Sequence, residues 1–157
     1  MNSYISGDWL WIEGTHAMRS QLLDILSDAD LAFSPGGENA TLGALCRGLG
    51  EIEHSYTQSL KTLKQDWSYT NTEAGIERSV AQLRAWYQTL DEEMKSTVAA
   101  LSDDDFKKSV DRGGFELTVT RQLDVYLQAL LIFFGKAIVY LKAMNKAVPE
   151  QIQDYIG

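Results

Sequence analysis

The sequence predicts an all-α fold, a four-helix bundle formed by a single domain spanning residues 1–157. Four long stretches place apolar side chains three and four residues apart, which is the spacing of one helix face. Both prolines, Pro35 and Pro149, lie between these stretches, so they interrupt no helix interior. Four long helices joined by short or medium connections are typical of a four-helix bundle.

The first two helices are separated by the clearest loop of the chain. A helix is expected from about Gly7 to Leu26, although its apolar stripe is imperfect. Residues 33–39 combine Ser, Pro, Gly and Asn, and this composition predicts a loop. The second helix is expected to begin near Asn39 or Thr41, because both residue types cap helix N-termini, and to run to about Leu63.

The second half of the chain is expected to hold two further long helices. The third is predicted over residues 73–101 and the fourth, the most apolar, over residues 120–144. A short irregular segment, residues 107–118, precedes this last long helix and contains a turn signal and one short extended piece. Pro149 can start a final short helix, because the first helical position needs no amide hydrogen.

Composition and charge restrict the classes of partner. The net charge of −8 and the scattered lysines and arginines argue against nucleic acid as a partner. The longest apolar stretch, residues 125–144, contains Gln128 and two lysines, so a buried helix is favoured over a membrane span. The single cysteine, Cys46, is expected in the core, and without a leader sequence the expected location is the cytoplasm.

The order of several short motifs resembles the DinB/YfiT-like family. These motifs are Leu26–Leu31, Phe33–Gly36, Thr41–Tyr56, Gly135–Met144, Val148–Pro149 and Tyr155–Ile156. The resemblance covers most of the chain and implies a four-helix bundle that is commonly a homodimer. It also implies a divalent metal such as nickel, zinc, iron or manganese, held by one histidine of the second helix and a His-x-x-x-His pair of the fourth. Characterised relatives include thiol-dependent transferases and hydrolases of small molecules.

Carried over position by position, the resemblance places all three metal ligands on residues that cannot ligate. The histidine of the second helix falls on Gly48, and the pair of the fourth helix falls on Ala129 and Phe133. The fourth predicted helix contains no histidine, so no shift of the alignment restores the set. We therefore expect no metal and no other cofactor, and the sequence assigns no catalytic residue.

Only two histidines are present, His16 and His54. His54 follows Gly48 by six residues, which is about 120° around a helix, so it is expected at the surface or at an interface. His16 belongs to the first helix and is expected to be an ordinary, partly exposed histidine.

Helical spacing indicates which polar side chains can line the former metal site. We counted about 100° per residue from the ligand positions of the second and fourth helices. The polar residues within about 60° of those faces are the pocket candidates Glu51, Ser55, Gln122, Tyr126 and Lys136. A Glu51–Lys136 pair can bind a ligand or perform acid–base chemistry, and the alternative is an ordinary structural ion pair.

Two hypotheses of function follow. The first is a DinB-like protein that has lost its metal site and binds a small molecule or a protein partner. The alternative is a metal-dependent or acid–base hydrolase or thiol transferase with a relocated site formed by Glu51, Tyr126 and Lys136. Under both hypotheses we expect a homodimer through helix faces, because of the resemblance and the surplus of aromatic side chains.

Overall fold

The computed structural model describes residues 2–156 and is mostly helical, which confirms the all-α prediction. In chain order the elements are α1 (Ser3–Ser6), α2 (Trp9–Asp24), η1 (Asp28–Ala32), α3 (Leu42–Thr62), η2 (Ile76–Arg78), α4 (Val80–Ala100), η3 (Asp105–Lys107), β1 (Ser109–Asp111), β2 (Glu116–Thr118), α5 (Val119–Ala143) and α6 (Glu150–Ile156). The hairpin of β1 and β2 is antiparallel and pairs Val110 with Leu117.

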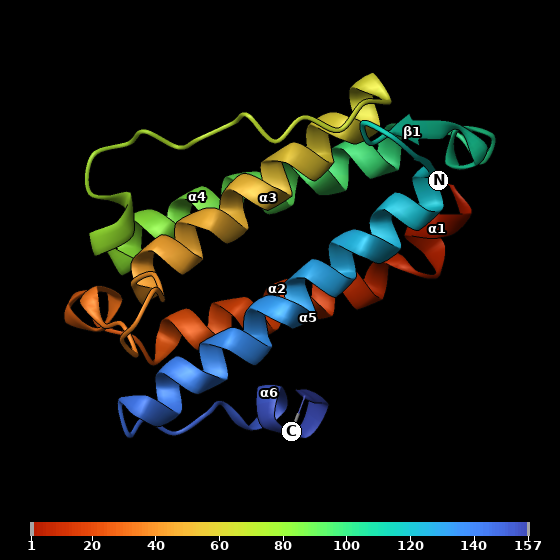
Figure 1. Cartoon of the computed structure of the whole chain (residues 1–157). Coiled ribbons are helices and arrows are strands. Elements are labelled where there is room, and N and C mark those ends of the chain that lie inside the picture. Colours follow the sequence, from red (N-terminus) through yellow and green to blue (C-terminus); the bar gives the residue numbers. More distant parts are fainter. Residues whose placement is uncertain (1, 157) are drawn as a thin grey trace.

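The four long helices form a bundle of two parallel pairs. Figure 1 shows α2 and α5 side by side in one direction, and α3 and α4 side by side in the opposite direction. Because α3 and α4 run in the same direction, the segment that connects the end of α3 to the start of α4 has to travel back along the length of the bundle. Residues 63–79 make this return on the outside of the bundle. All four helices thereby contribute to one shared hydrophobic core.

Side-chain caps determine where three of the long helices begin. The side chain of Thr41 accepts a hydrogen bond from the Ala44 amide and starts α3, as the sequence predicted. Ser79 caps α4 in the same way, so the predicted start of this helix at residue 73 is wrong. The preceding Gly75 has a φ of 89°, which a continuous helix does not allow. The apolar pattern extends upstream because Ile76 of the 3₁₀ turn is buried as well.

Two glycines of α3 allow neighbouring groups to approach closely. A Cβ atom on Gly43 would lie 1.9 Å from the backbone oxygen of Glu77, and one on Gly50 would lie 2.4 Å from the Trp86 ring. A Cβ atom on Gly48 would meet no described atom within 4 Å. Gly50 is therefore a packing glycine, whereas at Gly48 there is room for a side chain that the sequence does not supply.

The apolar composition of α5 is explained by its place in the core. By length and composition alone, α5 is the one described helix that would be able to cross a membrane. Eleven of its residues are buried in the bundle, among them Leu123 and Phe134 with no exposed surface. This agrees with the predicted buried helix. Cys46 is also fully buried, as expected, and burial raises the pKa of its thiol to about 12.

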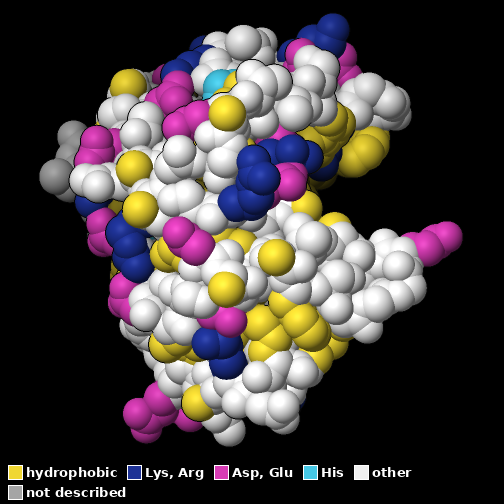
Figure 2. Space-filling view, turned by 90° about the vertical axis from the view of Figure 1, so that its left-hand side faces the viewer, with side chains coloured by type: hydrophobic (Ala, Val, Ile, Leu, Met, Phe, Trp, Pro, Cys, Tyr) yellow, Lys and Arg dark blue, Asp and Glu magenta, His cyan; other side chains and the backbone are white. Residues whose placement is uncertain are grey.

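The surface carries charges of both signs. On the face that Figure 2 shows, Lys and Arg side chains lie among Asp and Glu side chains rather than in one patch. The described chain has several ion pairs between exposed partners, such as Lys95–Glu13 at 2.5 Å. Pairs of this kind contribute about 0–1 kcal/mol to stability. The charges that matter most energetically are therefore those buried inside the bundle.

Candidate functional site

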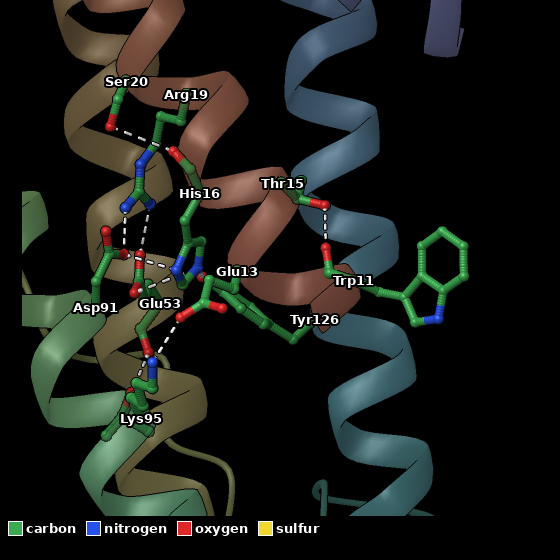
Figure 3. A network of polar contacts seen from close by, with 11 residues as sticks. Trp11, Glu13, Thr15, His16, Arg19, Ser20, Glu53, Asp91, Lys95 and Tyr126 are labelled. Carbon is green, nitrogen blue, oxygen red and sulfur yellow. Dashed lines mark hydrogen bonds and ion pairs between the residues drawn. The ribbon is translucent and has the colours of Figure 1, made fainter. Parts of the chain in front are cut away.

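A network of polar side chains lies inside the bundle and takes residues from every long helix (Figure 3). His16 and Arg19 come from α2, Glu53 from α3, Asp91 from α4 and Tyr126 from α5. All but Asp91 are buried, and Asp91 has 29% of its side chain exposed. Polar groups at such depth are stable only when they satisfy one another.

His16 occupies the centre of the network. Its Nδ1 atom lies 2.9 Å from Oδ1 of Asp91, and its Nε2 atom lies 2.7 Å from the hydroxyl of Tyr126. Because the Asp91 carboxylate can only accept, Nδ1 carries the proton of that hydrogen bond. Asp91 therefore fixes the orientation of the imidazole, and Nε2 shares one hydrogen bond with Tyr126. A carboxylate, an imidazole and a hydroxyl in this order make up a chain along which a proton can move.

Arg19 supplies the permanent positive charge. Its Nη1 atom donates to Oε2 of Glu53 at 2.6 Å, and its Nη2 atom donates to Asp91. The guanidinium also lies 3.9 Å from the ring centroid of Tyr87, which is cation–π geometry. One buried cation therefore bridges two carboxylates that come from different helices.

The surroundings separate the two carboxyl groups chemically. Burial raises the pKa of Glu53 above its usual value, although Arg19 and His16 oppose the rise. Burial also acts to raise the pKa of Asp91, but the hydrogen bond from His16 and the charge of Arg19 bring it below its usual value. Two carboxyl groups with opposite pKa shifts are the arrangement from which acid and base roles arise.

Arg19 and Tyr126 keep their protons. Burial alone would lower the pKa of Arg19, but the charges of Glu53, Tyr126 and Asp91 raise it, so the guanidinium remains charged. Burial raises the pKa of Tyr126 well above its usual value, so this phenol stays neutral at physiological pH.

The same cluster contains a set of metal-ligating atoms. One ligand atom each of His16, Glu53 and Asp91 lie within 4.8 Å of one another. Imidazole and carboxylate groups suit divalent transition metals. However, the Arg19 guanidinium donates to both carboxylates and already provides a cation there. A divalent ion would have to compete with a cation that is attached to the fold.

The three-histidine centre that the resemblance implies does not fit this chain. Gly48 and Ala129 are half-buried and offer no ligand atom. Phe133 is buried, with its ring 5.5 Å from that of Phe134. An aromatic side chain fills this part of the core, where the resemblance implies a histidine. The side chains at these three positions therefore supply no ligand for a three-histidine centre.

The pocket candidates from helical spacing do not converge. Tyr126 belongs to the network, and Ser55 and Gln122 are buried. Glu51 instead pairs with Arg47 at 3.2 Å. Lys136 is exposed and makes no ion pair within residues 2–156, so the expected Glu51–Lys136 pair is wrong. The physical reason is that helical spacing gives a direction around one axis but not the depth at which a long side chain ends.

The two histidines differ from each other in their surroundings. The expectation of a partly exposed His16 is wrong, because Asp91 and Tyr126 replace the water that an exposed imidazole would contact. His54 is half-buried on the surface of α3 and stacks on Tyr69 with ring centroids 3.8 Å apart, in keeping with its expected surface position. Burial lowers the pKa of His54.

The network reaches solvent through Asp91. A hollow of about 250 Å³ lies beside this residue, between α2 and α4, and is lined by Ser20, Leu23, Arg84, Tyr87, Gln88 and Asp91. Oδ1 of Asp91 is bonded to His16 and Arg19, while its Oδ2 has no hydrogen-bond partner among the described residues. The hollow therefore offers a free carboxylate oxygen beside apolar and polar side chains.

Comparison with solved structures shows the same fold in two bacterial proteins. A DinB-like protein from Bacillus subtilis superimposes with a TM-score of 0.69 at 15% identity, over 85% of this chain and 89% of that chain. A DinB-like protein from Bacillus cereus gives a TM-score of 0.69 at 15% identity, over 92% and 93%. No functionally curated protein matches the sequence significantly.

A sequence model of the DinB superfamily matches residues 12–128, which include most of α2, all of α3 and α4, and the first part of α5. This range contains every member of the buried network. Together with the bundle topology, the match establishes the relationship that the short motifs indicated. The chain belongs to the DinB superfamily.

Proposed function

We propose that this chain is a DinB-superfamily protein that has lost the three-histidine metal centre and binds a small molecule in the hollow beside Asp91. The observation that carries the proposal is the free carboxylate oxygen of Asp91, the one network member that opens onto solvent. Positions Gly48, Ala129 and Phe133 support the loss of the metal, since none carries a ligand atom.

The lining of the hollow favours a ligand with two parts. Leu23 and the Tyr87 ring provide apolar surface. Asp91 provides a negative charge that its pKa, lowered by His16 and Arg19, maintains at neutral pH. A small molecule with an N–H donor or an ammonium group next to a flat apolar part would satisfy both. Compact aromatic amines are the simplest members of this class.

Benzylamine is a suitable probe for this site. In ¹H–¹⁵N NMR titrations we expect saturable shifts of the Ser20 and Gln88 amides, and smaller ones with benzyl alcohol, which lacks the charge. Asp91→Asn should weaken binding by about ten- to a hundredfold, since a charge-assisted hydrogen bond is worth about 1.5–3 kcal/mol. Asp8→Asn, a change at an exposed carboxylate, should not affect binding. Unchanged affinity in folded Asp91→Asn would contradict the proposal.

The Asp91–His16–Tyr126 chain favours a second candidate, an acid–base enzyme of the hydrolase or thiol-transferase type. The site would differ from the Glu51–Tyr126–Lys136 set that helical spacing indicated. His16 would relay a proton between the mouth of the hollow and the interior. Turnover of an activated ester or thiol substrate that is lost in both His16→Gln and Asp91→Asn would favour this candidate over simple binding.

We further propose a homodimer that forms through α2 and α5. These neighbouring helices expose Leu10, Trp11, Ile132 and Val139, each more than half accessible. Large apolar side chains that are exposed on neighbouring helices are typical of interfaces. Light scattering at micromolar concentration should give twice the chain mass of 17.6 kDa, and Ile132→Glu with Val139→Glu should reduce it to the monomer. A monomeric wild-type mass would contradict this geometry. Location in the cytoplasm and the lack of a nucleic-acid partner remain part of the proposal.

A further inference from the structure

Apart from Arg19 of the buried network, a second partly buried cation lies at the end of the bundle where α3 ends and α5 begins. The turn between β1 and β2 places Arg112 beside the segment that leaves α3, and two backbone hydrogen bonds join these parts: Gln65 N–H to Asp111 O at 2.8 Å and Asp111 N–H to Leu63 O at 2.9 Å. The arginine is half-buried. Its position is therefore determined by the fold rather than by a free loop.

Aromatic rings surround the guanidinium of Arg112. Its central carbon lies 5.6 Å from the ring centroid of each of Tyr56, Trp67 and Phe115. Tyr56 is buried, whereas Trp67 and Phe115 are 53% and 60% exposed. Two large apolar side chains next to this cation are therefore exposed to water. We call Arg112 with these three rings the arginine cage.

The groups that hold Arg112 are uncharged. Its Nη1 atom donates to Oε1 of Gln122 at 2.6 Å. Gln122 is fully buried and donates through Nε2 to Oγ of Ser59 at 2.7 Å and to Oε1 of Gln65. The Nε2 atom of Gln65 is itself buried and has no partner within the described chain. An orphaned donor of this kind costs about 1–3 kcal/mol and indicates that an acceptor is missing.

Arg112 retains an unpaired positive charge in an acidic protein. Four other arginines, Arg19, Arg47, Arg84 and Arg121, form ion pairs with carboxylates. Arg112 forms none within residues 2–156, although the chain has a net charge of −8. The neighbouring Asp111 accepts instead from the amide of Gly113 at 2.8 Å. The cage therefore combines a free cation, flat apolar faces and a nearby orphaned donor.

We propose that the arginine cage binds the carboxylate of a small aromatic acid. A guanidinium presents its N–H groups in one plane and can grip a carboxylate through two parallel hydrogen bonds. The exposed faces of Trp67 and Phe115 can stack on the aromatic ring of the same ligand. Burying these faces removes apolar surface from water, which gives the ring its share of the affinity. This site is separate from the hollow beside Asp91 and takes the opposite charge.

Sodium benzoate is the probe, followed through the indole N–H of Trp67 by NMR. We expect a saturable shift with benzoate, and weaker binding of both cyclohexanecarboxylate, which is not flat, and benzyl alcohol, which is not charged. Arg112→Gln should weaken benzoate binding by about tenfold or more, and Arg112→Lys by less, because lysine keeps the charge but not the planar fork. Arg78→Gln is the matched control, since Arg78 also lacks a carboxylate partner in the described chain and should be dispensable.

Two further variants keep the test decisive. Phe115→Ala removes an exposed ring without touching the buried amides, and should weaken benzoate binding even if Arg112→Gln does not fold. Asp91→Asn should leave benzoate binding unchanged, so failure of the cage and failure of the hollow can be told apart. The proposal would be overturned if the wild-type protein showed no saturable shift with benzoate. It would also be overturned if Arg112→Lys and Phe115→Ala both bound benzoate as tightly as the wild type.

Discussion

Replacing Arg19 with methionine is expected to destabilise the bundle by about 3–5 kcal/mol, the cost of removing one partner from a buried ion pair. The guanidinium is almost fully buried and bridges Glu53 and Asp91. Methionine fills a similar volume but leaves the Glu53 carboxylate in the core without a cation. The free energy of unfolding, measured in urea at neutral pH, reports this cost directly.

Matched variants separate the charge from the packing. Lys95→Met removes an exposed pair with Glu13 and should change stability by less than about 1 kcal/mol. Arg19→Met combined with Glu53→Leu removes both buried charges and should recover a large part of the loss. If Arg19→Met alone stayed within about 1 kcal/mol of the wild type, the guanidinium would not be the balancing cation of the network.

The architecture was largely predictable because its determinants are local. Apolar spacing located the long helices, and the cap at Thr41 fixed the start of α3. The parallel course of α3 and α4 was not predictable, since residues 63–79 carry no signal for the direction in which they travel. The late start of α4 was missed because a 3₁₀ turn buries Ile76 in the same stripe.

The sequence alone did not identify the members of the buried network. It supported only the expectation that Gly48, Ala129 and Phe133 supply no metal ligand. The network depends on side chains from four helices, and residue spacing along one helix does not reveal partners on another. Lys136, for example, lies on the helix face that residue spacing selected, yet its side chain is exposed to solvent.

A usable signal for the network was nevertheless present in α2. Ile12, His16, Arg19 and Leu23 follow one another at intervals of four, three and four residues, which is one helix face. Two polar residues within a buried apolar stripe indicate a buried polar network, since such groups need partners. The identity of those partners, Glu53 and Asp91, required the three-dimensional structure.

We propose that Arg19 is the cation of the buried site and that this site needs no metal ion. Isothermal titration of chelator-treated protein with Zn²⁺, Ni²⁺ and Mn²⁺ tests it most directly. His16, Glu53 and Asp91 provide the only described set of three metal-ligating side chains. A metal would have to displace the guanidinium from two charge-assisted hydrogen bonds, each worth about 1.5–3 kcal/mol.

The predicted result is no saturable binding of any of the three ions at micromolar concentration, for the wild type and for His16→Gln alike. Protein isolated without an affinity tag should accordingly contain far less than one transition-metal ion per chain. Stoichiometric binding to the wild type that His16→Gln abolishes would contradict the claim, because it would show that the cluster holds a metal in spite of Arg19.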